Sequence, residues 1–146
     1  VLFRSDSAQP FYDEHLAPNL SAEVTRKLRW HQEQGHQTVL VTGSIDYYLK
    51  PVMEALSIDH LLCTHLEVDE HGILTGRPKG QVCVGEAKVA LANDLAKHHG
   101  IDFSQSYAYG NSENDIPILK HVGYPAIVNP TRGLAQYAKR HNWPSL

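Results

Sequence analysis

Four residues between positions 42 and 115 have side chains or backbone groups that could act together on a phosphoryl group. A hydroxyl and exposed backbone amides donate hydrogen bonds to phosphate oxygens, and a lysine ammonium offsets their negative charge. A carboxylate binds a hard divalent cation through oxygen. These residue types together predict a site for a phosphate and a Mg²⁺ ion. The residues are Thr42, Gly43, Lys88 and Asp115.

Each of these residues also has an ordinary structural interpretation. A threonine at the end of a strand commonly belongs to a turn or a helix cap, and a lysine in the first turns of a helix is commonly solvated. Asn114 and Asp115 precede Pro117, which is typical of a helix cap followed by proline in the first turn. The functional interpretation therefore depends on the combination of these residues, in this order, at strand ends.

The elements that must position these residues alternate in type along the chain. Predicted helices cover 21–34, 45–56, 85–99, 116–120 and 131–140. Predicted strands cover 37–42, 58–63, 106–109 and 126–128, with a surface hairpin formed by 66–69 and 73–75. This alternation predicts an open α/β fold with mostly parallel strands and right-handed crossovers, and a strand at 37–42 that is buried on both faces. In such folds ligands bind beyond the carboxyl ends of the strands, which is where Thr42 and the loop 110–115 fall.

Composition sets the class of protein. The chain has 146 residues, 42% of them apolar and 20% charged, which predicts a single globular domain. Thirteen basic residues against 16 acidic residues give a net charge of −3 without a basic cluster, so we expect no nucleic-acid partner. No apolar run approaches the roughly 20 residues of a membrane span, so we expect no transmembrane segment. Cys63 and Cys83 are expected to be buried thiols of a cytoplasmic protein.

Other catalytic motifs are missing from the sequence. Gly80 and Gly85 have the separation of a nucleotide P-loop, but Lys88 lies outside the required Gly-Lys-Ser/Thr. Thr42-Gly43-Ser44 is not the nucleophile elbow of a serine hydrolase. The ten histidines show no zinc-protease spacing, and we expect most of them at the surface.

Three segments resemble the second, third and fourth motifs of the haloacid dehalogenase-like (HAD) hydrolases, in the phosphoserine-phosphatase-like subfamily IB. They are 39–44 (VLVTGS), 85–88 (GEAK) and 109–119 (YGNSENDIPIL). The resemblance covers residues 11–146 and implies a Rossmann-like HAD core with flanking helices and a small β-hairpin. It implies Mg²⁺-dependent hydrolysis of a small phosphorylated substrate. In this family an aspartate attacks phosphorus to form an aspartyl-phosphate, and a second aspartate protonates the leaving oxygen and activates water.

The resemblance also implies roles for individual residues. Thr42 and the amide of Gly43 would bind the transferring phosphoryl group, and Lys88 would offset its charge. Asp115 and Asn111 would serve the metal. Asn111 stands where most HAD proteins carry aspartate, and we expect this loss of one negative charge to weaken metal binding. Asn114 is assigned a supporting role.

The first family motif, D-x-D-x-T, occurs nowhere in residues 1–146. We therefore expect a C-terminal part of a phosphatase that lacks the first strand, the nucleophile, its acid/base partner and most of the cap, and is inactive alone. Residues 11–20 are interpreted as a cap remnant, and 1–10 are left unassigned, with a non-native origin open. The alternative is a non-catalytic, regulatory or phosphate-binding member of the family. A receiver domain is disfavoured by the order of the motifs, and the sequence leaves the oligomeric state open.

Overall fold

The computed structural model describes residues 8–146, and the chain divides into two compact units, Val1–Cys83 and Val84–Leu146. Most of the unassigned segment 1–10 lies outside the described residues. Among the residues that are described, no helix has the length and apolar character needed to cross a membrane. The single-domain interpretation of 11–146 stays a prediction.

The first unit opens with helical structure. A short helix, a π-helical turn and a 3₁₀ turn follow one another: α1 (Ala8–Phe11), η2 (Tyr12–Leu16) and η3 (Ala17–Asn19). The next helix is α2 (Ala22–Glu33), which begins where the Ser21 hydroxyl accepts a hydrogen bond from the amide of Val24 at 3.4 Å. A serine in this position satisfies one of the free amides of the first turn, and it confirms the predicted helix at 21–34.

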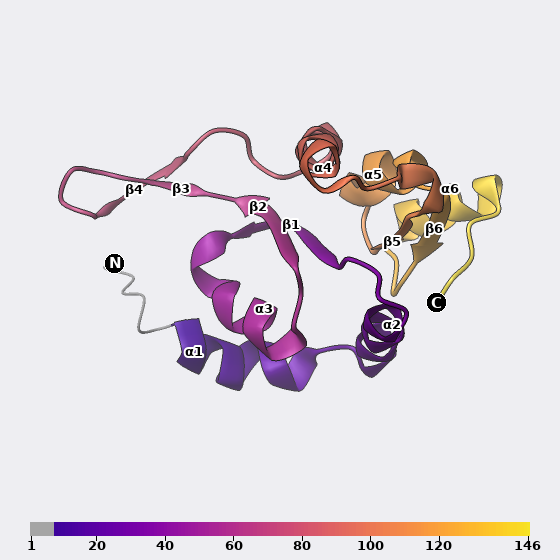
Figure 1. Cartoon of the computed structure of the whole chain (residues 1–146), viewed down its shortest axis with the longest axis horizontal. Helices are drawn as coiled ribbons and strands as arrows, with labels where there is room; N and C mark the ends of the chain where they lie inside the picture. Colours follow the sequence, from indigo (N-terminus) through magenta and orange to yellow (C-terminus); the bar gives the residue numbers. More distant parts are fainter. Residues whose placement is uncertain (1–7) are drawn as a thin grey trace. The chain divides into compact units, whose positions relative to one another are not determined.

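A parallel strand pair forms the centre of the first unit (Figure 1). The strands β1 (Val39–Ile45) and β2 (His60–Thr64) pair from Val39 with His60 to Ile45 with Thr64, as the predicted strands and their parallel direction require. The expected burial of β1 on both faces is wrong, because its first residues are only partly buried. A strand is buried on both faces only where other elements cover both faces, and the described residues do not cover β1 to that extent.

The connection between β1 and β2 differs from the predicted single helix at 45–56. Ile45 ends β1, a 3₁₀ turn η4 (Asp46–Tyr48) follows, and the helix α3 begins later (Lys50–Leu56). Pairing of Ile45 with the neighbouring strand overrides its helical spacing. Pro51 lies in the first turn of α3, where its missing N–H needs no partner.

The predicted hairpin is confirmed as β3 (Leu66–Val68) and β4 (Leu74–Pro78), which run antiparallel. Its turn is closed by Asp69, whose side chain accepts hydrogen bonds from the amides of His71 and Ile73, both at 2.9 Å.

The second unit repeats the α/β alternation around a second parallel pair of strands (Figure 1). The strands pair from Tyr107 with Tyr124 to Gly110 with Ile127, and Ser145 adds a bridge to Ile127. The predicted elements are confirmed here with small shifts of their ends. They are α4 (Glu86–His99), β5 (Tyr107–Gly110), α5 (Ile116–His121), β6 (Tyr124–Ile127) and α6 (Arg132–His141). Two 3₁₀ turns that the sequence did not predict, η5 (Phe103–Gln105) and η6 (Glu113–Asp115), precede β5 and α5.

Each unit has its own buried side chains. In the second unit Leu119, Ile127, Leu134 and Ala138 form one cluster beneath the helices. The first unit buries apolar residues of α3 and both cysteines, which are free thiols.

Candidate functional site

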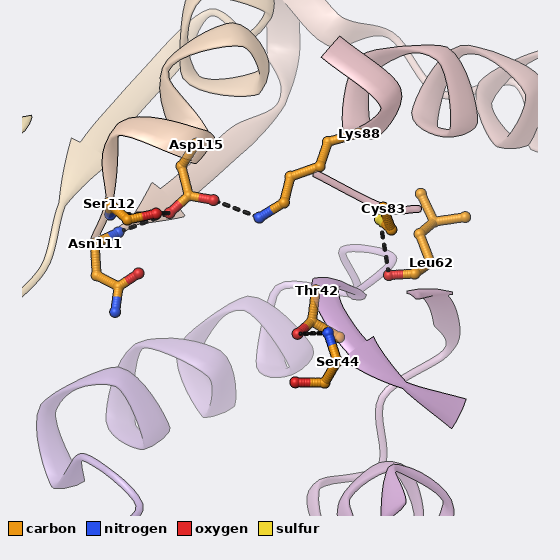
Figure 2. A network of polar contacts seen from close by, with 8 residues as sticks. All are labelled: Thr42, Ser44, Leu62, Cys83, Lys88, Asn111, Ser112 and Asp115. Atoms are coloured by element: carbon orange, nitrogen blue, oxygen red, sulfur yellow. Dashed lines mark hydrogen bonds and ion pairs between the residues drawn. The ribbon is translucent and has the colours of Figure 1, made fainter. Parts of the chain in front are cut away.

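The first part of the candidate site lies at the end of β1. The amide of Ser44 donates to Thr42 Oγ1 at 3.1 Å, so the hydroxyl hydrogen of Thr42 is still available to a ligand (Figure 2). The hydroxyl of Thr64 on β2 donates to the carbonyl of Gly43 at 3.0 Å. This bond fixes the orientation of the peptide after Gly43, beside the hydroxyl that was predicted to bind phosphate.

The second part is a buried ion pair in the second unit. Lys88, the third residue of α4, and Asp115, the last residue of η6, are each 7% exposed. Lys88 Nζ lies 2.5 Å from Asp115 Oδ1 (Figure 2). The interpretation of Lys88 as a solvated charge is therefore wrong, since a buried lysine in proteins is nearly always paired.

The other carboxylate oxygen of Asp115 organises the loop before it. Oδ2 accepts hydrogen bonds from the backbone amides of Asn111 at 3.0 Å and Ser112 at 3.1 Å. Burial alone would raise the pKa of Asp115, but the hydrogen bond and charge of Lys88, together with these two amides, outweigh burial and hold the pKa below its ordinary 3.8. The carboxylate is therefore ionised at neutral pH.

These contacts show whether the Asp115 side chain caps the helix α5. Asp115 does not cap α5 with its side chain; it completes a capping box with Ser112 in the short turn η6. Pro117 lies in the first turn of α5, as that interpretation predicts. Gly110 is required by the same packing, because a Cβ there would lie 2.7 Å from Asp115 Cβ and 2.9 Å from Leu119 Cδ1.

The loop 110–115 is also anchored on the start of α6, which the sequence did not indicate. The Thr131 hydroxyl donates to Glu113 Oε2 at 2.7 Å, and the Thr131 amide donates to the carbonyl of Asn111 at 2.8 Å. The Thr131 hydrogen bond is the main cause of a lowered pKa at Glu113. A Cβ at Gly133 would overlap Glu113 Oε1, so a larger residue there would require the Glu113 side chain to move.

The structure thus brings three predicted residues together in the second unit, namely Lys88, Asn111 and Asp115. Thr42 and Gly43 lie together in the first unit. Asn114 is exposed next to Asp115, and its supporting role stays a prediction.

The donors of the second unit fit a well-hydrated Mg²⁺ ion. Asp115 Oδ2 accepts from the amides of Asn111 and Ser112 and from the Ser112 hydroxyl, whereas Oδ1 accepts from Lys88 alone among these groups and keeps a lone-pair position for a cation. The exposed side chain of Asn111 adds a carbonyl oxygen. Within 8–146 no cluster of three or more His, Cys, Asp or Glu side chains is placed to hold a metal. Mg²⁺ commonly keeps several waters and binds through one or two protein oxygens plus substrate phosphate, so this donor set suits it.

Comparison with known proteins identifies the class of this chain. The sequence profile of the haloacid dehalogenase-like hydrolases matches residues 3–120, and the chain belongs to this family. The Rossmann-like HAD fold expected from the sequence is confirmed.

Proteins similar to this chain include phosphatases by name. A probable phosphatase of Mycobacterium tuberculosis H37Rv is 32% identical over 134 residues, covering 90% of this chain and 45% of the relative. The crystal structure of a protein of unknown function from Bordetella pertussis Tohama I has a TM-score of 0.88 at 28% identity, over 97% of this chain and 65% of that one. A substrate-bound phosphoserine phosphatase has a TM-score of 0.65 at 26% identity, over 77% of this chain and 53% of that one. The chain therefore spans between about half and two thirds of the length of these proteins.

Proposed function

We propose that this chain carries the phosphate-binding part of a Mg²⁺-dependent phosphomonoester hydrolase that acts on a small phosphorylated substrate in the cytoplasm. Membership of the HAD family and the phosphatases among its relatives support the proposal. The observation that carries it is the buried Lys88–Asp115 pair, because a buried charge pair adds little net stability and buried ionisable groups of this kind are concentrated at functional sites.

The chain's own residues bind and orient the phosphoryl group in this proposal. The Thr42 hydroxyl donates one hydrogen bond to it, and the amide of Gly43 donates another. Lys88 has three N–H donors and uses one on Asp115, so it can donate to a phosphate oxygen without leaving its partner. Asn111 and Asp115 would hold Mg²⁺, which when bound supplies positive charge against the phosphoryl oxygens.

The aspartates that form and release an aspartyl-phosphate are not supplied by a D-x-D-x-T motif within residues 1–146. We therefore propose that this chain binds phosphate but does not turn over a phosphomonoester by itself. The same observation keeps the second candidate, a phosphate-binding or regulatory member of the family without catalysis.

Titration of the 146-residue chain with inorganic phosphate, by calorimetry or NMR in the presence of Mg²⁺, tests phosphate binding. Thr42→Val removes one hydrogen bond to a charged group, worth about 1.5–3 kcal/mol, and should weaken binding about tenfold or more. Thr75→Val is the matched control, because Thr75 lies on the exposed β4 strand of the hairpin. Equal affinity of wild type and Thr42→Val would refute the assigned role of Thr42.

A colorimetric assay with p-nitrophenyl phosphate separates the two candidates. The 146-residue chain is expected to release no phosphate. A longer natural chain that contains D-x-D-x-T is expected to release it only with Mg²⁺, and an inactive longer chain would favour the non-catalytic candidate. Turnover by the 146-residue chain that is lost in Asp115→Ala would overturn the proposed inactivity.

A further inference from the structure

An aspartate and a histidine lie directly beyond the paired ends of β1 and β2. The last paired residues are Ile45 and Thr64, so Asp46 and His65 follow them side by side. His65 Nδ1 lies 2.8 Å from Asp46 Oδ2. This pair belongs to the same strand ends as Thr42, but none of the family motifs includes it.

The hydrogen bond between His65 and Asp46 has a defined donor and a defined acceptor. A carboxylate only accepts hydrogen bonds, so His65 Nδ1 carries the proton and donates it to Asp46. The other ring nitrogen, Nε2, lies on the opposite side of an imidazole that is 57% exposed. Asp46 Oδ1 is buried and has no hydrogen-bond partner among residues 8–146, so the contact with His65 is the polar contact through which this carboxylate acts. Asp46 therefore orients His65 and leaves Nε2 free to meet a ligand.

The position of the pair relates it to the phosphate. Asp46 lies directly after the end of β1, four residues after Thr42. Val41 pairs with Leu62 and Ile45 with Thr64, so β1 bulges here and β2 crosses the same interval in two residues, about 7 Å along a strand. The Thr64–Gly43 hydrogen bond holds the two strand ends together between these points. The rings of Phe11 and Tyr48 lie 4.7 Å apart, so the helical segment before α2 lies against the turn that carries Asp46. The alcohol part of a phosphomonoester bound at Thr42 would therefore be within reach of this end of the strands.

We propose that His65, oriented by Asp46, is a specificity-determining residue that hydrogen-bonds through Nε2 to a polar group on the alcohol part of the substrate. It would favour phosphomonoesters whose alcohol carries a second polar group a few bonds from the ester oxygen over aryl phosphates, which would still bind through their phosphate. The proposal rests on the proposed phosphate binding at Thr42.

Three ligands test it: inorganic phosphate, phenyl phosphate and glycerol 3-phosphate, each titrated into the 146-residue chain with Mg²⁺. Glycerol hydroxyls both donate and accept, so they suit Nε2 in either protonation state. His65→Ala should lower the affinity for glycerol 3-phosphate about fivefold, which is the effect of one lost neutral hydrogen bond. The affinity for the other two ligands should not change. The matched control is His71→Ala, because His71 is an exposed hairpin histidine 3.6 Å from Glu70.

Imidazole NMR gives a readout that a structural role would not move. In long-range ¹H–¹⁵N spectra His65 should show the Nδ1–H tautomer, and its Nε2 resonance should shift with glycerol 3-phosphate but not with inorganic phosphate. An unmoved Nε2 resonance, or an equal loss of all three ligands in His65→Ala, would overturn the assignment of His65. Failure of the wild type and of His71→Ala to bind any of the three would instead overturn the proposed function, and this inference with it.

Discussion

Breaking the Lys88–Asp115 pair should strongly destabilise the second unit. Asp115→Asn leaves the ammonium of Lys88, 7% exposed, without its counter-ion. Removal of one partner of a buried ion pair costs about 3–5 kcal/mol. Domains of this size commonly have only about 5–15 kcal/mol of stability, so this variant should lose a large part of it. The loss of stability in Lys88→Met should be at the lower end of this range, because the carboxylate of Asp115 keeps its two amide donors.

Urea unfolding, followed by the fluorescence of Trp143 and by circular dichroism, measures these changes. The double variant Lys88→Met/Asp115→Leu should be less destabilised than the sum of the single variants, since replacement of both charges by apolar groups leaves neither charge buried alone. The matched control is the pair formed by Lys97 and Asp94 on the same helix, 3.3 Å apart and 74% and 70% exposed. Its single variants should change the unfolding free energy by less than about 0.5 kcal/mol.

The same pair gives a pH dependence with a defined sign. The folded-state pKa of Asp115 is lowered from 3.8, so its contribution to stability is present above about pH 4 and is lost as pH falls through the folded pKa. Asp115→Asn should flatten this part of the acid limb. Two results would refute the view that the pair stabilises the second unit. One is that the losses of unfolding free energy in the two single variants add up to the loss in the double variant. The other is that these losses are no larger than those at Lys97 and Asp94.

Three further predictions concern other buried positions. Burial is the main cause of a lowered pKa at His31, so stability should fall as pH drops from about 6.5 through the folded pKa, and His31→Gln should remove that slope in a pH series of unfolding curves. Gly110→Ala should cost about 1–3 kcal/mol in urea unfolding, because the new Cβ overlaps Asp115; an unchanged midpoint would contradict this packing. Burial raises the pKa of Cys63 to about 11, and Cys83 is fully buried, so a disulfide reagent at pH 8 should label neither thiol before denaturation.

The sequence predicted elements whose signals are local. The helix α4 ends at Gly100, which adopts a left-handed conformation, and α6 begins at Thr131, whose hydroxyl accepts from the amide of Leu134. These caps act within one turn and need no knowledge of the rest of the fold. The error at Ile45 has the opposite origin. Its spacing fits a helix, but its pairing partner Thr64 lies 19 residues away, and only the structure shows that pairing.

The residues of the candidate site also divide into those that local signals predict and those that depend on long-range packing. Residue type and position at strand ends were enough to select Lys88 and Asp115, whereas their mutual burial depends on how α4 packs against the loop 110–115. The Asp46–His65 pair follows from strand register, which the sequence alone did not fix. The sequence places His65 among the surface histidines, which its exposure agrees with, and only the Ile45–Thr64 pairing shows that it lies beside Asp46.

The charges of the second unit explain why a cation belongs to the proposed function. Lys88 and Asp115 neutralise each other, and Asn111 contributes an oxygen without a charge. Glu113 is negative, but its carboxylate is engaged with Thr131 at the start of α6. A phosphate dianion that accepts a hydrogen bond from Lys88 would therefore add about two negative charges to a nearly neutral site. A divalent cation held beside Asn111 restores neutrality, so phosphate and Mg²⁺ should bind with mutual reinforcement, each raising the affinity of the other by the same factor.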